Sequence, residues 1–440
     1  MQLIFFNDLQ DFSDRIFASK GIFVLMKNAV ATKSPRPLLI RPHQLACKTN
    51  KQILMPLAEG PQSPPAKYMR SPRKYLRQKA FEYVSIPNAP VTPAMIIKDF
   101  SDLINRHEKS EVFQYKQIFY IRKSPQLKSI PQDDPDYFVF KKDEHIKYRY
   151  QQIVEICRGN FGSVLKCYDH KTKKIVAVKM IKDRPKIHKQ ILMEKVALDM
   201  IQEADPKFTH FIVPVIDKFY FRGFYCFCFE LLWKDTYTCQ KDESFVGYED
   251  DLLKTVSKQI CDSLNFFHSL GLVHCDIKPE NIVWTNDLKT TVNLIDFGCC
   301  CHEGNPLFKY IQSRFYRAPE VILHISFTKA IDVWSFGLVI IELKLGHPLY
   351  AGNNEKEQLG MYYSSLGPPD EKYLRSSPRF SEFFGDDASI KNEYSYPLFD
   401  ELVVGLDPDL VDLVRKCLEW DPNKRIKLAE VLKHPYLVKK

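Results

Sequence analysis

The chain has 440 residues, of which 45% are hydrophobic and 27% charged, as in ordinary globular proteins. This length exceeds what a single hydrophobic core usually fills, so more than one domain is expected. No run of 18 or more apolar residues occurs, which argues against a membrane span. Residues 1–17 contain three aspartates and no leading cation, which argues against a signal peptide.

Twelve cysteines at irregular spacing, without CxxC pairs, favour reduced thiols over a disulfide framework or a zinc site. We therefore expect a cytoplasmic or nuclear protein. Residues 1–140 carry the whole basic excess, with 21 lysines and arginines against 12 acids. The densest stretch, 67–79, has six cations and no acid. A solvated linker is the favoured interpretation, a nuclear-import signal comes next, and nucleic-acid binding is the least favoured.

Prolines divide the first third of the chain. Residues 1–80 are basic and repeatedly broken by proline, which predicts a flexible or loosely attached region. Residues 81–147 are expected to form a small accessory module, because helical spacing resumes over 91–113. Thr92 before Pro93 suits a helix N-cap. The apolar residues that share the predicted helical face are Ile96, Ile97, Phe100, Leu103 and Ile104.

From residue 148 the pattern is that of an α+β protein, with a β-rich part (148–232) followed by a larger helical part (233–440) and a cleft between them. Expected strands rich in β-branched and aromatic residues cover 148–156, 163–169, 173–181, 211–218 and 223–231. Helices are expected over 186–203 and 250–271, the second ending at the C-capping Gly271.

The first β-turn, "ICRGNFGSV" (156–164), has the spacing of a glycine-rich phosphate-binding hairpin. Gly159, Gly162 and Val164 fit the pattern G-x-G-x-x-G-x-V, and Cys157 replaces its first glycine. Farther on, "VAVKM" places Lys179 on an apolar strand, where the lysine needs a counter-charge.

Three further stretches carry groups suited to phosphoryl transfer. Glu194, in the helix expected over 186–203, would pair with Lys179. In "HCDIKPEN" (274–281), Asp276 would accept the proton of a substrate hydroxyl, Lys278 would reach the transferred phosphoryl group and Asn281 would bind a metal ion. Asp296, in "NLIDFG", would bind magnesium.

These motifs, in this order, resemble a eukaryotic protein kinase over about 148–437, together with "RAPE" (317–320), "IDVWSFG" (331–337) and "WDPNKRI" (420–426). The resemblance implies a two-lobed kinase fold, with ATP and Mg²⁺ as cofactors and serine or threonine as the phosphate acceptor. It also implies a structural pair between Glu320 and Arg425. The residues that it places around ATP are Cys157, Gly159, Phe161, Gly162, Val164, Ala177, Lys179, Phe229, Glu230 and Leu232.

The match narrows to the dual-specificity tyrosine-regulated kinase family, in the proline-directed CMGC group. "HCD" and "YIQSRFYRAPEVIL" (310–323) are similar to that family, and 92–121 is similar to the accessory region of its class II members. The resemblance implies autophosphorylation of Tyr310, whose phosphate Arg314 and Arg317 would clamp. Another CMGC kinase, such as a homeodomain-interacting kinase, or a kinase-fold scaffold remains an alternative.

Substrate preference is also implied by the resemblance. Arg317 would favour proline after the target residue, and Glu280 would meet an arginine before it. Ser377, in "RSSPRF", fits this pattern and is a candidate autophosphorylation site. We expect a monomeric kinase domain, with a CMGC-type insert at about 355–400, that acts on protein substrates.

Cys275 stands where many kinases carry an arginine that holds an activation-loop phosphate. Its presence removes that route of regulation and leaves the catalytic groups in place. Cys275 is expected to come near Cys301. The two thiols are expected to be reduced at rest and, by hypothesis, to form a reversible disulfide under oxidation.

Overall fold

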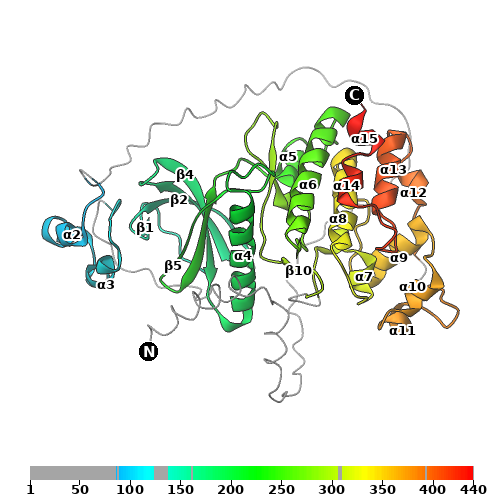
Figure 1. The fold of residues 1–440 in the computed structure, drawn as a ribbon, viewed down its shortest axis with the longest axis horizontal. Helices are drawn as coiled ribbons and strands as arrows, with labels where there is room; N and C mark the ends of the chain where they lie inside the picture. Colours follow the sequence, from blue (N-terminus) through cyan, green and yellow to red (C-terminus); the bar gives the residue numbers. More distant parts are fainter. Residues whose placement is uncertain are drawn as a thin grey trace, which may run out of the picture. The chain divides into compact units, whose positions relative to one another are not determined.

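The computed structural model describes residues 86, 89–122, 137–159, 162–305, 310–391 and 394–439. They belong to one compact unit, Val84–Lys440 (Figure 1). The predicted flexible region 1–80, which includes the basic stretch 67–79, and the predicted ATP-binding residue Phe161 lie outside the described residues.

The accessory module begins with α2 (Pro93–Asp99), whose first residue is the predicted proline. Thr92 Oγ1 accepts a hydrogen bond from the Met95 backbone N–H at 3.4 Å, so the predicted N-cap is confirmed. The prediction of one continuous helical face over 91–113 is wrong. The chain forms four short pieces: α2, the 3-10 turns η1 (Ser101–Leu103) and η2 (Val112–Gln114), and α3 (Arg106–Glu111).

The second helix starts separately because Asn105 caps it. Asn105 Oδ1 accepts from the Glu108 N–H at 2.9 Å, and Glu108 Oε2 accepts from the Asn105 N–H at 3.0 Å, which is a reciprocal capping box. The predicted apolar residues still share one hydrophobic cluster, with Ile96 and Ile104 buried in it.

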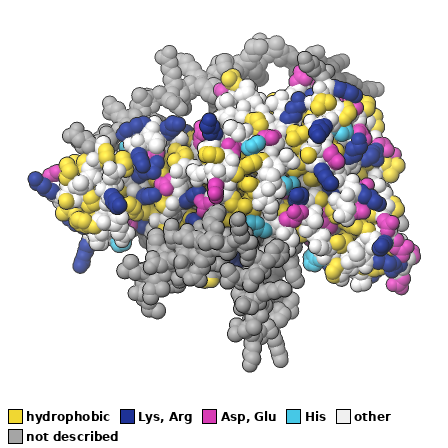
Figure 2. Space-filling view, in the orientation of Figure 1, with side chains coloured by type: hydrophobic (Ala, Val, Ile, Leu, Met, Phe, Trp, Pro, Cys, Tyr) yellow, Lys and Arg dark blue, Asp and Glu magenta, His cyan; other side chains and the backbone are white. Residues whose placement is uncertain are grey.

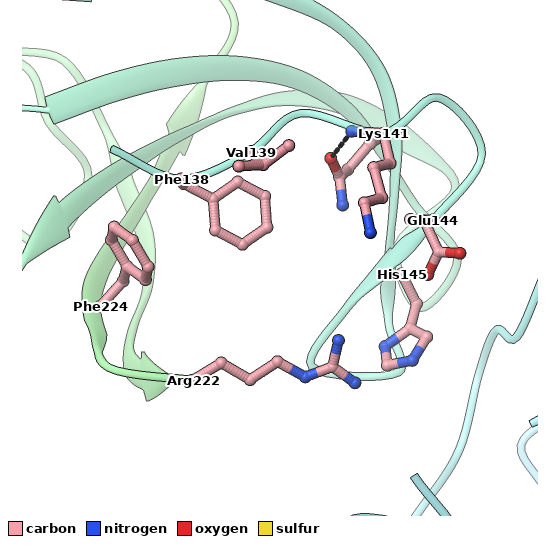
Figure 3. Close-up of a pocket in the computed structure, with 8 residues that line it drawn as sticks. Phe138, Val139, Lys141, Glu144, His145, Arg222 and Phe224 are labelled. Atoms are coloured by element: carbon pink, nitrogen blue, oxygen red, sulfur yellow. Dashed lines mark hydrogen bonds between the residues drawn. The ribbon is translucent and has the colours of Figure 1, made fainter. Parts of the chain in front are cut away.

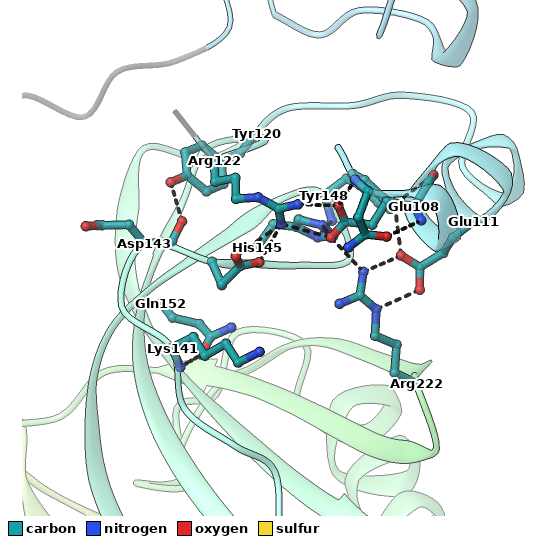
Figure 4. Close-up of polar contacts among 12 residues, drawn as sticks. Glu108, Glu111, Tyr120, Arg122, Lys141, Asp143, His145, Tyr148, Gln152 and Arg222 are labelled. Atoms are coloured by element: carbon teal, nitrogen blue, oxygen red, sulfur yellow. Dashed lines mark hydrogen bonds and ion pairs between the residues drawn. The ribbon is translucent and has the colours of Figure 1, made fainter. Parts of the chain in front are cut away.

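Ion pairs attach this module to the sheet that follows (Figure 4). The Glu108 carboxylate accepts hydrogen bonds from Arg122 at 2.6 Å and Arg222 at 3.2 Å and lies 3.1 Å from Nε2 of His145. Arg222 also binds Glu111 through Nε at 2.8 Å and Nη2 at 2.6 Å. Burial raises the pKa of Glu108, but the bonds from His145 and Arg122 outweigh it, and the pKa lies well below its usual range.

A six-stranded antiparallel sheet forms the β-rich part, which we call the N-lobe (137–232). Its strand order is β1-β2-β3-β4-β6-β5. The strands are β1 (His145–Ile146), β2 (Tyr150–Gly159), β3 (Gly162–Asp169), β4 (Lys174–Lys182), β5 (Val215–Phe221) and β6 (Phe224–Glu230). One face of the sheet buries Leu165, Val178 and Cys228 in a hydrophobic cluster. The opposite face carries Lys179 and Phe227, and Phe227 is buried there against residues of the helix that follows β4.

Helix α4 (Pro185–Ala204) is close to the predicted 186–203 and packs with β5 and β6 residues in a second cluster (Figure 1). The strand predicted over 211–218 is displaced toward higher numbers. Its first residues pair instead with β9 (Val292–Leu294), where Phe211 O accepts from the Leu294 N–H at 2.8 Å and Leu294 O accepts from Val213 N–H at 3.1 Å. The N-lobe is thereby connected to the helical part.

The helical part, which we call the C-lobe (233–439), surrounds the largest hydrophobic cluster. Gly271 has φ +74° just after α6, as expected of a C-terminal glycine. The larger helices are α5 (Thr236–Asp242), α6 (Asp250–Ser269), α8 (Ala330–Leu345), α9 (Glu355–Leu366) and α13 (Pro408–Cys417). The shorter helices are η3 (Pro279–Asn281), η4 (Arg314–Tyr316), α7 (Pro319–Ile322), α10 (Glu371–Arg375), α11 (Phe380–Phe383), α12 (Phe399–Leu402), α14 (Leu428–Val431) and α15 (Pro435–Val438). The paired strands are β7 (Leu272–Val273) with β10 (Cys301–His302), and β8 (Ile282–Trp284) with β9.

The surface of the described residues mixes charges of both signs. On the face shown in Figure 2, lysine and arginine side chains are interspersed with aspartate and glutamate. Among the described helices, none combines the length and apolarity needed to cross a bilayer.

Candidate active site

Strand register places four predicted ATP-binding residues on the face of the N-lobe sheet opposite the cluster that contains Leu165, Val178 and Cys228. Val164 lies opposite Lys179, and Ala177 lies opposite Phe229. Directly opposed residues on neighbouring strands point to the same face, and so do residues two apart on one strand. Val178, which lies between Ala177 and Lys179, points to the other face and into the core. Cys157 lies opposite Val164 and joins the same row.

The turn between β2 and β3 brings backbone close to backbone. Gly159 pairs with Gly162 at the end of the hairpin. Gly162 has φ +125°, and a Cβ there would lie 2.1 Å from the carbonyl oxygen of Met180, so a side chain is excluded. The hairpin then leads through β4 and β6 to Glu230, where β6 ends, and Leu232 follows in the segment that connects to the C-lobe.

Lys179 joins two carboxylates from separate parts of the chain. Its Nζ donates to Glu194 Oε1 of α4 at 2.6 Å and to Asp296 Oδ1 at 2.8 Å. Burial lowers the pKa of Lys179, but the two carboxylates outweigh it and hold the pKa above its usual range. Burial also raises the pKa of Asp296, but Lys179 outweighs it, so this carboxyl stays ionised near neutral pH. The predicted pairing of Lys179 with Glu194 is present.

The loop between β7 and η3 holds Asp276 with hydrogen bonds to both carboxylate oxygens. Oδ2 accepts from Lys278 Nζ at 2.7 Å, and Oδ1 accepts from the backbone N–H and the hydroxyl of Ser313 at 3.2 and 2.8 Å. Asn281 Nδ2 donates to the Asp276 carbonyl at 2.8 Å. The three residues predicted in this loop are thus in direct contact. Ser313 was not anticipated, although it lies in the quoted "YIQSRFYRAPE".

Asp332, on α8, anchors this loop and was also not assigned a role from the sequence. Its fully buried carboxylate accepts from the backbone N–H groups of His274 at 2.8 Å and Cys275 at 3.0 Å. Cys275 has φ +65° and Asp296 has φ +62°, a left-handed conformation that is uncommon for residues other than glycine. Backbone strain of this kind clusters at functional sites.

The residues predicted to bind metal fit a hard cation such as magnesium. With its amide nitrogen held by Asp276, Asn281 has its side-chain oxygen left for a metal, and Asp296 offers an ionised carboxylate. Carboxylate and amide oxygens are the ligands that Mg²⁺ and Ca²⁺ prefer.

Tyr310 is 62% exposed, and its ring lies over the guanidinium of Arg317 at 3.8 Å. Arg317 is itself buried and donates to the carbonyls of Ile311 at 2.9 Å and Gln312 at 2.7 Å. It also pairs with Glu355 at 2.9 Å, a contact not foreseen from the sequence.

The second predicted clamp residue lies elsewhere. Arg314 Nη1 donates to the Gly352 carbonyl at 3.4 Å, and its buried Nε has no partner among the described residues. The structure therefore places Arg317 against the unphosphorylated Tyr310 and does not bring Arg314 to it.

Glu320 and Arg425 form a bidentate pair, with Nη1–Oε1 2.7 Å and Nη2–Oε2 3.0 Å. Both side chains are fully buried, so the structural pair implied by the resemblance is present. Ser377, in contrast, is a poor phosphorylation site. It is only 6% exposed and its hydroxyl donates to the Leu323 carbonyl at 2.7 Å, so the expectation from "RSSPRF" is wrong.

The two cysteines predicted to come together do so. The Sγ atoms of Cys275 and Cys301 lie 3.6 Å apart and both residues are buried. The hydrogen-bonding contact with Cys301 is the larger cause, and burial the second, that raises the pKa of the Cys275 thiol well above its usual range. Because the thiolate is the nucleophile in disulfide formation, the pair should resist oxidation at neutral pH.

We predict that peroxide inhibits the protein slowly at pH 7 and faster at pH 9, and that dithiothreitol reverses the inhibition. The Cys275→Ala variant should be insensitive at both pH values, as measured by residual phosphate transfer. Equal inhibition of wild type and Cys275→Ala would place the sensitive thiol elsewhere, for example at the exposed Cys157.

The Lys179 ion pairs lie on a small antiparallel sheet, and the Asp276 loop lies in the helical part joined to it. This combination defines a protein kinase. The protein kinase domain family model matches residues 150–437, so the chain belongs to that family. It acts on protein substrates and uses ATP and a divalent metal.

Its relatives narrow the assignment. The chain is 34% identical to dual specificity tyrosine-phosphorylation-regulated kinase 4 of Homo sapiens, over 79% of this chain and 70% of that protein. It is 35% identical to the probable serine/threonine-protein kinase dyrk2 of Dictyostelium discoideum, over 79% of this chain and 40% of the relative. It is 37% identical to serine/threonine-protein kinase ppk5 of Schizosaccharomyces pombe, over 70% of this chain and 38% of that protein. The chain is a member of the dual-specificity tyrosine-regulated kinase family, as the sequence motifs indicated.

Proposed function

We propose that this kinase uses magnesium and ATP to phosphorylate serine or threonine residues that precede proline and follow an arginine, after phosphorylating its own Tyr310. The observation that carries the proposal is that two sets of contacts are intact: Lys179 with Glu194 and Asp296, and Lys278 with Asp276. A kinase-fold scaffold would not need these groups to be retained.

Each residue has one role in this proposal. Asp276 accepts the proton of the substrate hydroxyl, and Lys278, which lies beside it, contacts the transferred phosphoryl group. Lys179, kept in position by Glu194, binds the α- and β-phosphates of ATP. Asn281 and Asp296 would hold magnesium, which neutralises phosphate charge when bound.

The preference for proline is supported by the segment that follows Tyr310. Gln312 has φ +63°, and its carbonyl oxygen is taken by Arg317. A backbone N–H docking at this carbonyl would find its acceptor already engaged, which costs free energy when the N–H is buried. Proline lacks that N–H and avoids the cost. This is the physical basis on which Arg317 would favour proline after the target residue.

The preference for an upstream arginine is supported by two carboxylates, of which only Glu280 was anticipated. Glu342, on α8, is 5% exposed, and its Oε2 has no partner among the described residues. Burial, together with the nearby carboxylate of Glu280, raises the pKa of Glu342 to about 7 despite a hydrogen bond from Tyr316. An arginine side chain would satisfy both carboxylates.

We predict that the advantage of an arginine peptide over its alanine counterpart is pH-dependent. Glu342 is mostly ionised at pH 8 and mostly protonated at pH 6, so the ratio of kcat/KM values should fall on acidification. At pH 8 the ratio should be roughly tenfold or more, since a hydrogen bond to a charged group contributes about 1.5–3 kcal/mol. In Glu342→Gln the ratio should be smaller and flat with pH. An unchanged ratio in that variant, or equal use of peptides without proline, would contradict the proposed specificity.

We predict phosphate on Tyr310 in protein expressed in bacteria, detected by mass spectrometry. The exposed ring leaves the hydroxyl accessible, and a phosphate there adds a charge of about −1.5 to −2 beside Arg317. Tyr310→Phe should therefore lower activity toward peptides. Fully active wild-type protein without phosphate on Tyr310 would contradict this role.

We also propose a monomeric enzyme without nucleic-acid partners, in the cytoplasm or nucleus. The mixed charge on the face shown in Figure 2 supports the absence of nucleic-acid partners, because nucleic-acid binding favours a continuous basic surface.

A further inference from the structure

A pocket of about 190 Å³ lies in the N-lobe, and none of its lining residues belongs to the candidate active site (Figure 3). One end is aromatic, where the rings of Phe138 and Phe224 meet edge to face at 5.4 Å. The residues that line the pocket are Phe138, Val139, Lys141, Glu144, His145, Gln152, Arg222 and Phe224.

The polar end of the pocket presents hydrogen-bond donors. Gln152 is 2% exposed, and its Oε1 accepts from the Lys141 backbone N–H at 3.0 Å, which leaves Nε2 without a hydrogen bond among the described residues. The ammonium of Lys141 likewise has no ion pair within the described part of the chain, and Figure 3 shows this side chain extending into the pocket. Two donors thus converge on one space.

The acidic lining residue offers little competition for these donors. Both carboxylate oxygens of Glu144 accept from Nη1 of Arg122, at 3.1 and 2.8 Å, and Figure 3 shows the carboxylate turned away from the aromatic end. Arg222 donates from Nε and Nη2 to Glu111, and its Nη1 has no partner in the described structure. The pocket therefore favours an anion.

We propose that this pocket binds a small molecule that carries one anionic group, a carboxylate or a phosphate, on an aromatic body. The ring would pack against Phe138 and Phe224. The anion would accept hydrogen bonds from Lys141, Gln152 and Nη1 of Arg222. Ligand sites commonly combine an apolar wall with a few convergent polar groups, and bonds between ionised partners are the stronger ones.

Binding here would be sensed by the accessory module. Arg222 lines the pocket and also holds Glu108 and Glu111 of α3 (Figure 4). A bound anion shares this guanidinium with the module, so the ligand and the attachment of the module are coupled.

The test is isothermal titration of the full chain saturated with magnesium and a non-hydrolysable ATP analogue, which keeps probes out of the nucleotide site. Phenyl phosphate and phenylacetate, the two arms for phosphate and carboxylate, should bind with a Kd on the order of 1 mM, a usual affinity for ligands of this size. Inorganic phosphate and 2-phenylethanol, each lacking half of the ligand, should bind about tenfold more weakly.

Lys141→Met keeps the aliphatic stem, so it should fold normally and weaken both aromatic anions about fivefold or more. The matched control is Lys142→Met, which changes the next, exposed residue and should bind as wild type does. Phe138→Leu should weaken phenyl phosphate without changing the binding of inorganic phosphate. Equal affinity of Lys141→Met and wild type, or no binding of either aromatic anion, would overturn the proposal. Because the nucleotide site is filled throughout, this result is independent of the proposed kinase specificity.

Discussion

Replacing Asp276 by asparagine is expected to lower kcat for peptide phosphorylation by about 10²–10⁴, the usual contribution of a general base. The substitution keeps the shape of the side chain and replaces one carboxylate oxygen by an amide group. The amide cannot accept a proton from the substrate, and it cannot accept at both positions now used by Lys278 and Ser313. Transfer of radiolabelled phosphate from ATP to a peptide measures the loss.

The control separates chemistry from folding. Asp287→Asn makes the same chemical change in an exposed turn between β8 and β9 and should leave kcat and the melting temperature unchanged. Asp276→Asn should melt within a few degrees of wild type, because Asp276 lies at the site and not in the core. Activity retained in Asp276→Asn would assign the proton to another group. A cellular effect that survives in this variant would belong to a scaffold function.

The sequence predicts the catalytic residues well because their chemistry requires fixed residue types in a fixed order. The pairing of Lys179 with Glu194 was predicted from their motifs, and the structure brings Nζ and Oε1 to 2.6 Å. Gly162 was predicted from the phosphate-binding glycine pattern, and the structure adds a second reason for it, since a Cβ there would meet the carbonyl oxygen of Met180.

Residues that act by packing or burial were harder to predict. Glu342 lies in a helix that is hydrophobic on all sides, and only its buried, partnerless oxygen marks it as unusual. Ser377 shows the reverse case, because a local sequence pattern cannot reveal that the hydroxyl is buried against Leu323. The helix expected over 91–113 ends at Asp99, and Asn105 starts a separate helix, α3, with a capping box that the apolar spacing did not reveal.

The buried ion pair between Glu320 and Arg425 allows a prediction about the stability of the fold. Arg425→Met should lower the free energy of unfolding by about 3–5 kcal/mol, because it leaves the fully buried Glu320 carboxylate without its counter-charge. Arg425 also donates to the carbonyls of Ala330, Glu419 and Trp420, so several acceptors lose a partner at once. The melting temperature should fall by on the order of 10 °C. Lys424→Met, at the adjacent and exposed position, should have little effect.

The double variant Glu320→Gln/Arg425→Met tests the cause of this loss. If the stranded charge is the main cost, removing it should recover part of the stability, so the double variant should unfold at a higher temperature than Arg425→Met alone. If the carbonyl acceptors dominate, the double variant should be as unstable as Arg425→Met or less stable. The second outcome would contradict the ion-pair explanation while leaving the structural importance of Arg425 intact. Chemical denaturation of the two variants at the same pH measures the free energy of unfolding of each.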